Sequence, residues 1–227
     1  MSPKYVEIFY QMIAFLFAIS VHESAHAWTA SRCGDPTARM LGRISLNPIR
    51  HIDLIGTIIM PLVAAISGFT LIGWAKPTPV DPRNFRRPVF DDILTSVAGP
   101  VSNFIVATGA LLVLGAIALS SPAGHSIVDA VQDGYSADLP SSALTPVAML
   151  FYELMLINIV LAVFNLIPVP PLDGSHVLRH FLPDSARMVY DRIGIFGLLA
   201  LVYLGGNLLS GMIRPFVRFY LTLLGKF

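Results

Sequence analysis

Two histidines and a glutamate near the N-terminus have the spacing of a hydrolytic metal site. They are His22, Glu23 and His26, within Ile19-Ser20-Val21-His22-Glu23-Ser24-Ala25-His26-Ala27. On a helix, residues four apart lie one above the other on the same face, so both imidazoles can bind one metal ion. Glu23 then lies one residue round the helix, close enough to reach a water molecule at the metal. This pattern indicates a zinc hydrolase with one Zn²⁺ ion, in which Glu23 is the general base.

A hydrolytic zinc site needs a further protein ligand and an open position for water. Asp173 is our strongest candidate, because it follows the inner end of an apolar segment and lies at a membrane depth similar to that of His22. Glu153 begins the same segment on its outer side, about 18 Å from the inner end along a helix axis, which is too far away. His176 and His180 form a less favoured alternative pair, because we expect them at the cytoplasmic surface.

The stretch before Asp173 is rich in proline. Pro168, Pro170 and Pro171 stop the preceding helix and force an extended turn. Such a turn can bend the carboxylate of Asp173 back toward a neighbouring helix, and unwound backbone is acceptable at this depth where it lines a wet cavity.

Asn103 is a further candidate for the chemistry. It follows Gly99 by four residues, so a small residue permits close helix approach on the same face that presents an amide. The amide donor can hold a developing oxyanion. The alternative is a hydrogen bond between helices within lipid, and the residues alone do not separate the two.

The composition places these residues in a membrane. With 55% hydrophobic and 13% charged residues, the chain is too apolar for an ordinary soluble domain, which averages about 25% charged residues. Cys33 is the single cysteine, so neither a disulfide framework nor a cysteine zinc site is available within the chain. The net charge of +1 gives no indication of nucleic-acid binding. We expect one all-α, multi-pass domain whose partner is the lipid bilayer, with core spans at about 5–31, 92–119 and 146–167, a further apolar segment at 52–73 and a C-terminal span at 193–213.

The distribution of charge predicts the orientation. No lysine or arginine lies between Arg87 and Arg179, and the acidic connection from 120 to 145 should face outward because positive charge marks the cytoplasmic side. The metal site then lies toward the cytoplasm. Basic clusters flank segment 52–73 on both sides, and Pro61 interrupts it, so we favour a re-entrant segment over a full span.

Two stretches near this segment have an extended pattern. Residues 39–47 partly alternate polar and apolar side chains, and residues 70–80 are rich in β-branched residues and end in prolines. We predict a small re-entrant or cytoplasmic β-hairpin here, with a structureless loop as the alternative. An exposed strand edge can bind an extended peptide as an added strand, so Asn47, at the end of the first stretch, is a candidate substrate-binding residue.

Together these motifs resemble the site-2 protease family of intramembrane zinc metalloproteases. The matching features are His22-Glu23-x-x-His26 in the first span, Gly99-Pro100-x-x-Asn103 in the next inward-starting span, and Asn165-x-x-Pro168 leading to Leu172-Asp173-Gly174 after the third span. The resemblance implies a three-helix catalytic core, zinc on His22, His26 and Asp173, Glu23 as base and Asn103 as a substrate or oxyanion contact. Gly99 and Asn165, within the same motifs, become candidate substrate-binding residues. The chain has no room for the PDZ insertion or the nucleotide-sensing domain of better-studied members, so it resembles a minimal form.

These observations predict an intramembrane zinc endopeptidase. Its expected substrate is a membrane-spanning protein, cut near the cytoplasmic face of a bacterial or archaeal cell membrane. The sequence does not indicate an oligomeric state. The alternatives are a metal-ion transporter or channel that uses the same polar residues, and a catalytically inactive membrane scaffold. Transporters often carry inverted repeats, whereas the His-Glu-x-x-His pattern occurs once.

Overall fold

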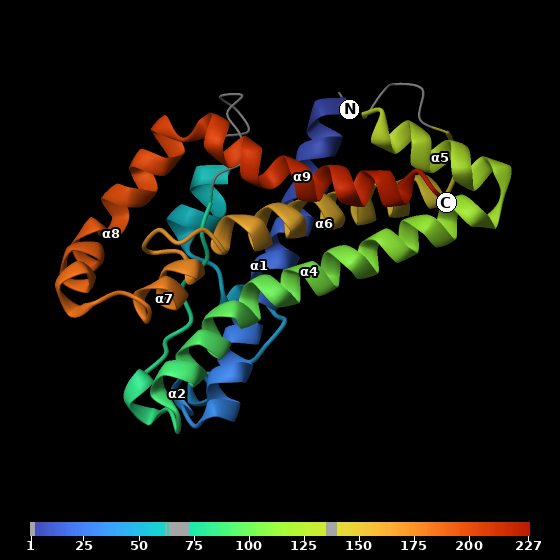
Figure 1. Cartoon of the computed structure of the whole chain (residues 1–227). Helices are drawn as coiled ribbons and strands as arrows, with labels where there is room; N and C mark the ends of the chain where they lie inside the picture. Colours follow the sequence, from blue (N-terminus) through green and yellow to red (C-terminus); the bar gives the residue numbers. More distant parts are fainter. Residues whose placement is uncertain (1–2, 62, 64–72, 135–139) are drawn as a thin grey trace.

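The computed structural model describes residues 3–61, 63, 73–134 and 140–227, and no β-strand occurs among them. The chain is instead built from helices (Figure 1). Their bounds are α1 (Pro3–Cys33), α2 (Thr37–Met40), α4 (Pro88–Ser120), α5 (Pro122–Gln132), α6 (Leu144–Asn165), α7 (Asp173–Arg179), α8 (Asp184–Leu204) and α9 (Gly206–Leu224). The predicted all-α class is confirmed.

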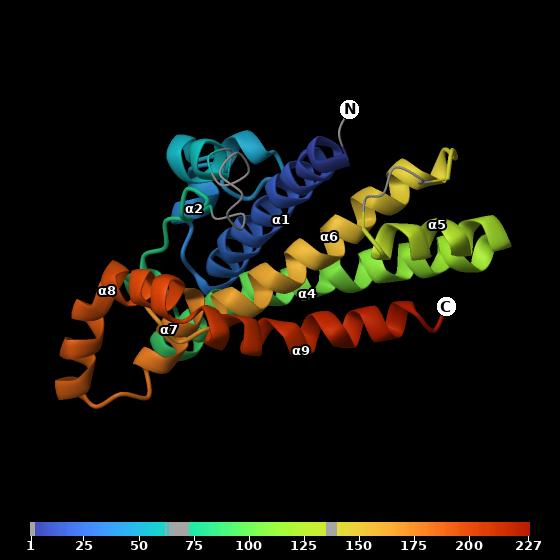
Figure 2. The same cartoon turned by 90° about the horizontal axis from the view of Figure 1, so that it is seen from above.

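Three long apolar helices form the core. Within the described residues, α1, α4 and α6 are each long and apolar enough to cross a membrane, and they contact one another pairwise (Figures 1 and 2). Their bounds contain or closely match the expected spans at 5–31, 92–119 and 146–167. A 33-residue helix such as α4 is about 50 Å long, which exceeds the hydrocarbon thickness of a bilayer.

Small residues bring the core helices together. Ala14 and Ala18 of α1, Ala107 of α4, and Ala148 and Ala162 of α6 are all fully buried. Without a hydrophobic driving force between helices in lipid, close approach through alanine and glycine favours their packing. This packing brings polar side chains of α1 and α4 into direct contact inside the bundle.

The connection between α4 and α6 contains a helix that the sequence reading did not identify. Helix α5 is amphipathic and buries Ile127, Val128 and Val131 in the same apolar cluster as the core helices. Its N-terminus is capped by Ser121, whose hydroxyl accepts the amide hydrogen of Gly124 at 3.0 Å. The outward orientation of this connection stays a prediction.

The C-terminal part contains a sharp bend. Figures 1 and 2 show α8 extending away from the core, whereas α9 returns alongside α4 and α6. The apolar parts of α8 and α9 are bent by 81° at the break around Gly205. The expected span at 193–213 is therefore divided between two helices rather than forming one straight rod.

The predicted β-hairpin is wrong for the described residues of both stretches. Residues 37–40 form the short helix α2, and residues 73–81 run extended without a partner strand. The backbone of the second stretch bonds to scattered groups instead: Trp74 donates to the carbonyl of Gly56, and the guanidinium of Arg43 donates to the carbonyls of Lys76 and Pro77. Pro77 and Pro79 lack the amide hydrogens that a strand ladder needs. Residues 70–72 of the predicted hairpin lie outside the described residues.

Segment 52–73 is described at residues 52–61, 63 and 73. A π-helical turn at Leu54–Ile59 begins after Asp53, whose side chain accepts the amide hydrogens of Ile55 and Gly56. Residues 62 and 64–72 lie outside the described part of the chain. The choice between a re-entrant and a spanning segment therefore stays a prediction.

Candidate metal centre

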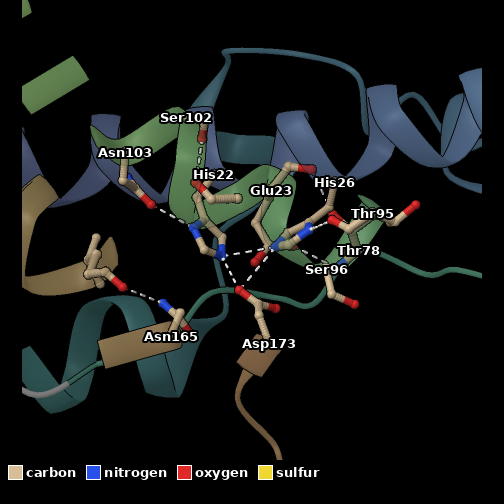
Figure 3. Close-up of polar contacts among 12 residues, drawn as sticks. His22, Glu23, His26, Thr78, Thr95, Ser96, Ser102, Asn103, Asn165 and Asp173 are labelled. Carbon is tan, nitrogen blue, oxygen red and sulfur yellow. Dashed lines mark hydrogen bonds and ion pairs between the residues drawn. The ribbon is translucent and has the colours of Figure 1, made fainter. Parts of the chain in front are cut away.

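Two histidines of α1 and an aspartate of α7 converge at one point in the core (Figure 3). The Nε2 atoms of His22 and His26 are 3.0 Å apart, and they lie 3.1 Å and 3.4 Å from Oδ2 of Asp173. Within the described residues, these three side chains are the group whose ligand atoms lie close enough together to hold a metal ion. The structure thus brings together the three residues that the sequence analysis selected.

Hydrogen bonds determine that Nδ1 carries the proton in both imidazole rings. Nδ1 of His26 lies 2.7 Å from the carbonyl oxygen of Thr95, and a carbonyl can only accept, so this nitrogen carries the proton. Nδ2 of Asn103 lies 3.2 Å from the carbonyl of Ala18, which turns the amide oxygen toward His22. Nδ1 of His22 therefore donates to Oδ1 of Asn103, at 2.6 Å.

The inner side of the site consequently suits a cation. With Nδ1 protonated, each neutral imidazole presents a lone pair at Nε2. Both lone pairs face Oδ2 of Asp173, which is buried and has no hydrogen-bond donor among the described residues. Two imidazole nitrogens and a carboxylate oxygen are a donor set that zinc prefers, and one coordination position is left for water.

The proline bend and α7 place Asp173. The chain leaves α6 at Asn165, passes the predicted turn and re-enters a helix at Asp173. Nε2 of His180, just beyond α7, lies 2.6 Å from a carboxylate oxygen of Asp92 on α4, and both side chains are mostly buried. This pair ties the ligand-bearing helix to α4.

Gly99 of α4 packs directly against the two histidines. A Cβ atom at this position would lie 2.4 Å from Nε2 of His26 and 2.6 Å from Cε1 of His22. Atoms of these types normally approach to about 3.5 Å. Gly99 therefore permits the close contact of α4 with the imidazoles. This packing explains why the residue is a glycine, and its predicted contact with substrate stays a prediction.

Asn103 is fully buried and both ends of its amide are used. Its oxygen accepts from His22, while Nδ2 donates to the carbonyl of Ala18 and, at 2.7 Å, to Oδ1 of Asn158 on α6. An oxyanion contact of the kind predicted would require one of these donor bonds to break. The geometry favours orientation of the His22 ring as the function of Asn103.

Glu23 lies beside the cluster and contacts the extended stretch that follows segment 52–73. Its Oε2 atom accepts the backbone amide hydrogen of Thr78 at 2.7 Å, and its backbone carbonyl accepts from Oγ1 of Thr78 at 3.0 Å (Figure 3). The second carboxylate oxygen has no hydrogen-bond donor among the described residues, so it remains for a water molecule.

The other candidates from the sequence lie apart from the cluster or have local partners. Asn47 is exposed and caps the turn Pro48–Arg50 by accepting the amide hydrogen of Ile49. Nδ2 of Asn165 donates to the carbonyl of Leu161 in its own helix. Glu153, His176 and His180 are not among the three residues that converge.

Several contributing groups escaped the sequence reading. Asn158 carried a signal, because it is a polar residue in the middle of an otherwise apolar span. The carbonyl of Thr95 and the amide of Thr78 carried none, because every residue type has a backbone carbonyl and almost every one has an amide. Asp92 lacked a signal for a different reason: its partner, His180, lies 88 residues away in the chain.

These features together define a membrane-embedded metallopeptidase of the His-Glu-x-x-His type. The chain belongs to peptidase family M50, whose family model matches residues 10–201. The resemblance to the site-2 proteases is thereby confirmed. The protein is a membrane protein and a zinc metalloprotease.

Curated relatives carry consistent names. The chain is 33% identical to "Putative zinc metalloprotease YwhC" of Bacillus subtilis over 86% of this chain and 79% of that protein. It is 27% identical to "Putative zinc metalloprotease Rip2" of Mycolicibacterium smegmatis, over 81% of this chain and 62% of that protein. A Rip2 of Mycobacterium tuberculosis is 28% identical over the same shares. No solved structure matches this chain significantly.

Proposed function

We propose that this protein is an intramembrane endopeptidase that cleaves membrane-spanning proteins near the cytoplasmic face. The observation that carries the proposal is the convergence of His22, His26 and Asp173 between helices apolar enough to span a bilayer. Ionisable side chains are costly inside a membrane and are retained there for function. The absence of basic residues between Arg87 and Arg179 supports a site near the cytoplasmic ends of α4 and α6.

His22, His26 and Asp173 would hold one zinc ion. A zinc ion in such a site acts as a Lewis acid, which makes a water molecule more acidic and polarises a carbonyl. Asn103 and the carbonyl of Thr95 hold the two imidazoles in the tautomer that leaves Nε2 free.

Glu23 moves the proton. Its free carboxylate oxygen takes a proton from the attacking water and delivers it to the nitrogen of the leaving peptide. A half-buried glutamate beside a metal site suits this role because it is close to the water without being a required ligand.

The substrate must be extended locally before it reacts. A helical backbone hides its carbonyls in hydrogen bonds, so a spanning helix cannot present the scissile bond directly. We expect helix-breaking residues near the cleavage site to increase the rate.

The test is metal analysis of the purified protein beside cleavage of a labelled single-span substrate. We expect one zinc per chain, cleavage that a chelator abolishes, and loss of cleavage by roughly 10²- to 10⁴-fold in Glu23→Gln with zinc retained. Glu7→Gln is the matched control, because Glu7 lies on the same helix about 24 Å away and pairs with Gln11. Zinc-free protein with full activity, or a Glu23→Gln variant that cleaves like the wild type, would refute the proposal. Zinc flux into liposomes without any peptide product would favour the transporter.

A further inference from the structure

The extended stretch after segment 52–73 is held against α1 at the catalytic glutamate. Thr78 makes two hydrogen bonds to one residue: its amide donates to Oε2 of Glu23, and its hydroxyl donates to the backbone carbonyl of Glu23. The second bond fixes the register of the stretch on the helix, so the amide can meet only this carboxylate.

The stretch is pinned on both sides of Thr78. On one side, the buried guanidinium of Arg43 donates to the carbonyls of Lys76 and Pro77, and the amide of Lys76 donates to the carbonyl of His51 at 2.9 Å. On the other side, the fully buried carboxylate of Asp35 accepts the amide hydrogen of Asp81 at 2.8 Å. An amide held in this way does not follow the carboxylate if the side chain rotates.

We infer that the backbone amide of Thr78 is a positioning group for the general base. A carboxylate has two oxygens, and a donor on Oε2 stops the group from rotating about its terminal bond. Oε1 is then aimed at the water that is to lose its proton. A charge-assisted hydrogen bond of 2.7 Å is among the stronger hydrogen bonds in proteins.

This inference rests on the proposed function, since it assigns a residue to the reaction in which Glu23 is the base. It differs from the metal ligands and their supports, because Thr78 contacts none of them through a hydrogen bond within the described residues. Its removal is therefore expected to change proton transfer without changing zinc binding.

The first variant is Thr78→Pro, which deletes both the amide hydrogen and the hydroxyl of this residue. Pro77 and Pro79 flank this position in an extended stretch, a conformation that proline adopts readily. We expect kcat to fall by about 10- to 100-fold, a part of what a general base contributes, with KM and zinc content unchanged. Thr78→Ser, which keeps both donors, should restore most of the rate. Incorporation of the α-hydroxy analogue of threonine, which replaces only the amide by an ester, should reproduce the loss with the side chain intact.

Ala75→Pro is the matched control in the same stretch. The amide of Ala75 has no hydrogen-bond partner among the described residues, so this proline is expected to leave kcat close to that of the wild type. A double mutant with Glu23→Gln provides a second check. If Thr78 acts through the carboxylate of Glu23, Thr78→Pro should cause little further loss in the Glu23→Gln background.

Three results would overturn the inference. These are an unchanged kcat in both amide-deleting variants, a loss of zinc together with activity, and an equal loss in the Glu23→Gln background. Failure of the proposed function would instead show in the wild type itself, as absence of zinc-dependent cleavage.

Discussion

Gly99 offers a sharp test of how the metal centre is built, through the substitution Gly99→Ala. The added methyl group would lie 2.4 Å from Nε2 of His26 and 2.7 Å from Nε2 of His22. An ordinary contact is about 3.5 Å, so either α4 or the two rings must move by about 1 Å. Either movement costs free energy, because Nδ1 of each ring is hydrogen-bonded to α4 itself, through Asn103 and the carbonyl of Thr95.

The expected effect is a loss of metal affinity. Metal sites tolerate changes in ligand distance of about 0.2 Å, and loss of the partners that orient a ligand costs roughly 10- to 100-fold in affinity. We therefore expect Gly99→Ala to bind zinc at least about 10-fold more weakly, in addition to about 1–3 kcal/mol of overpacking. Competition with a chromophoric chelator measures the affinity, and the absorption spectrum of the cobalt-substituted protein reports the coordination geometry.

Gly109→Ala is the matched control. Gly109 lies on the same helix, and no atom lies within 4 Å of a Cβ added there. Alanine is the better helix former, so this variant should be about 0.5–1 kcal/mol more stable or neutral, with unchanged zinc affinity. The reasoning is refuted if Gly99→Ala binds zinc as the wild type does, or if Gly109→Ala weakens binding to the same extent.

Two further predictions concern buried carboxylates near the ends of the spans. Burial alone raises the pKa of Asp35, but hydrogen bonds, led by that from Thr37, outweigh it and lower the pKa below the model-compound value of 3.8. The stabilisation is therefore fully present above the unfolded pKa and is lost as the pH falls through the lower folded pKa. In denaturant unfolding, the stability difference between wild type and Asp35→Asn should be constant above about pH 5 and shrink below about pH 4; a difference that stays constant below pH 4 would contradict this. Asp92→Asn should weaken the bond to His180 and lower zinc affinity, by less than the roughly 10- to 100-fold expected for a direct partner of a ligand, because His180 is not itself a ligand. Asp191→Asn, which breaks an exposed ion pair, should leave affinity within about 2-fold. Equal effects of both variants in the chelator competition would show that the bond to His180 has no special part in holding α7.

The sequence predicted the parts of the site that depend on periodicity. His22 and His26 share a helix face because they are four residues apart, and the same spacing places Gly99 and Asn103 on one face of α4. Asp173 required an additional argument from membrane depth and from the proline bend. The structure places all three ligand candidates together.

The remaining features depend on information that residue types do not carry. The use of both ends of the Asn103 amide follows from how α1, α4 and α6 pack, and hydropathy does not encode it. The bend of 81° around Gly205 was hidden because this segment also contains Gly194, Gly197 and Gly211, so Gly205 and Gly206 gave no distinct signal. The hairpin prediction failed because alternation in residues 39–47 is a weak signal, and the backbone of residues 73–81 is satisfied by side chains and single carbonyls.

Helix α4 contacts both histidines: the carbonyl of Thr95 and the amide of Asn103 hydrogen-bond to them, and Gly99 packs against them. These three positions lie within about two successive turns of this helix. A sideways displacement of α4 would therefore disturb both imidazoles together, and no displacement in that direction would release one ring while sparing the other. Occupancy of the metal centre should respond to such a displacement in an all-or-none manner, with intact and empty protein coexisting and few molecules of intermediate affinity.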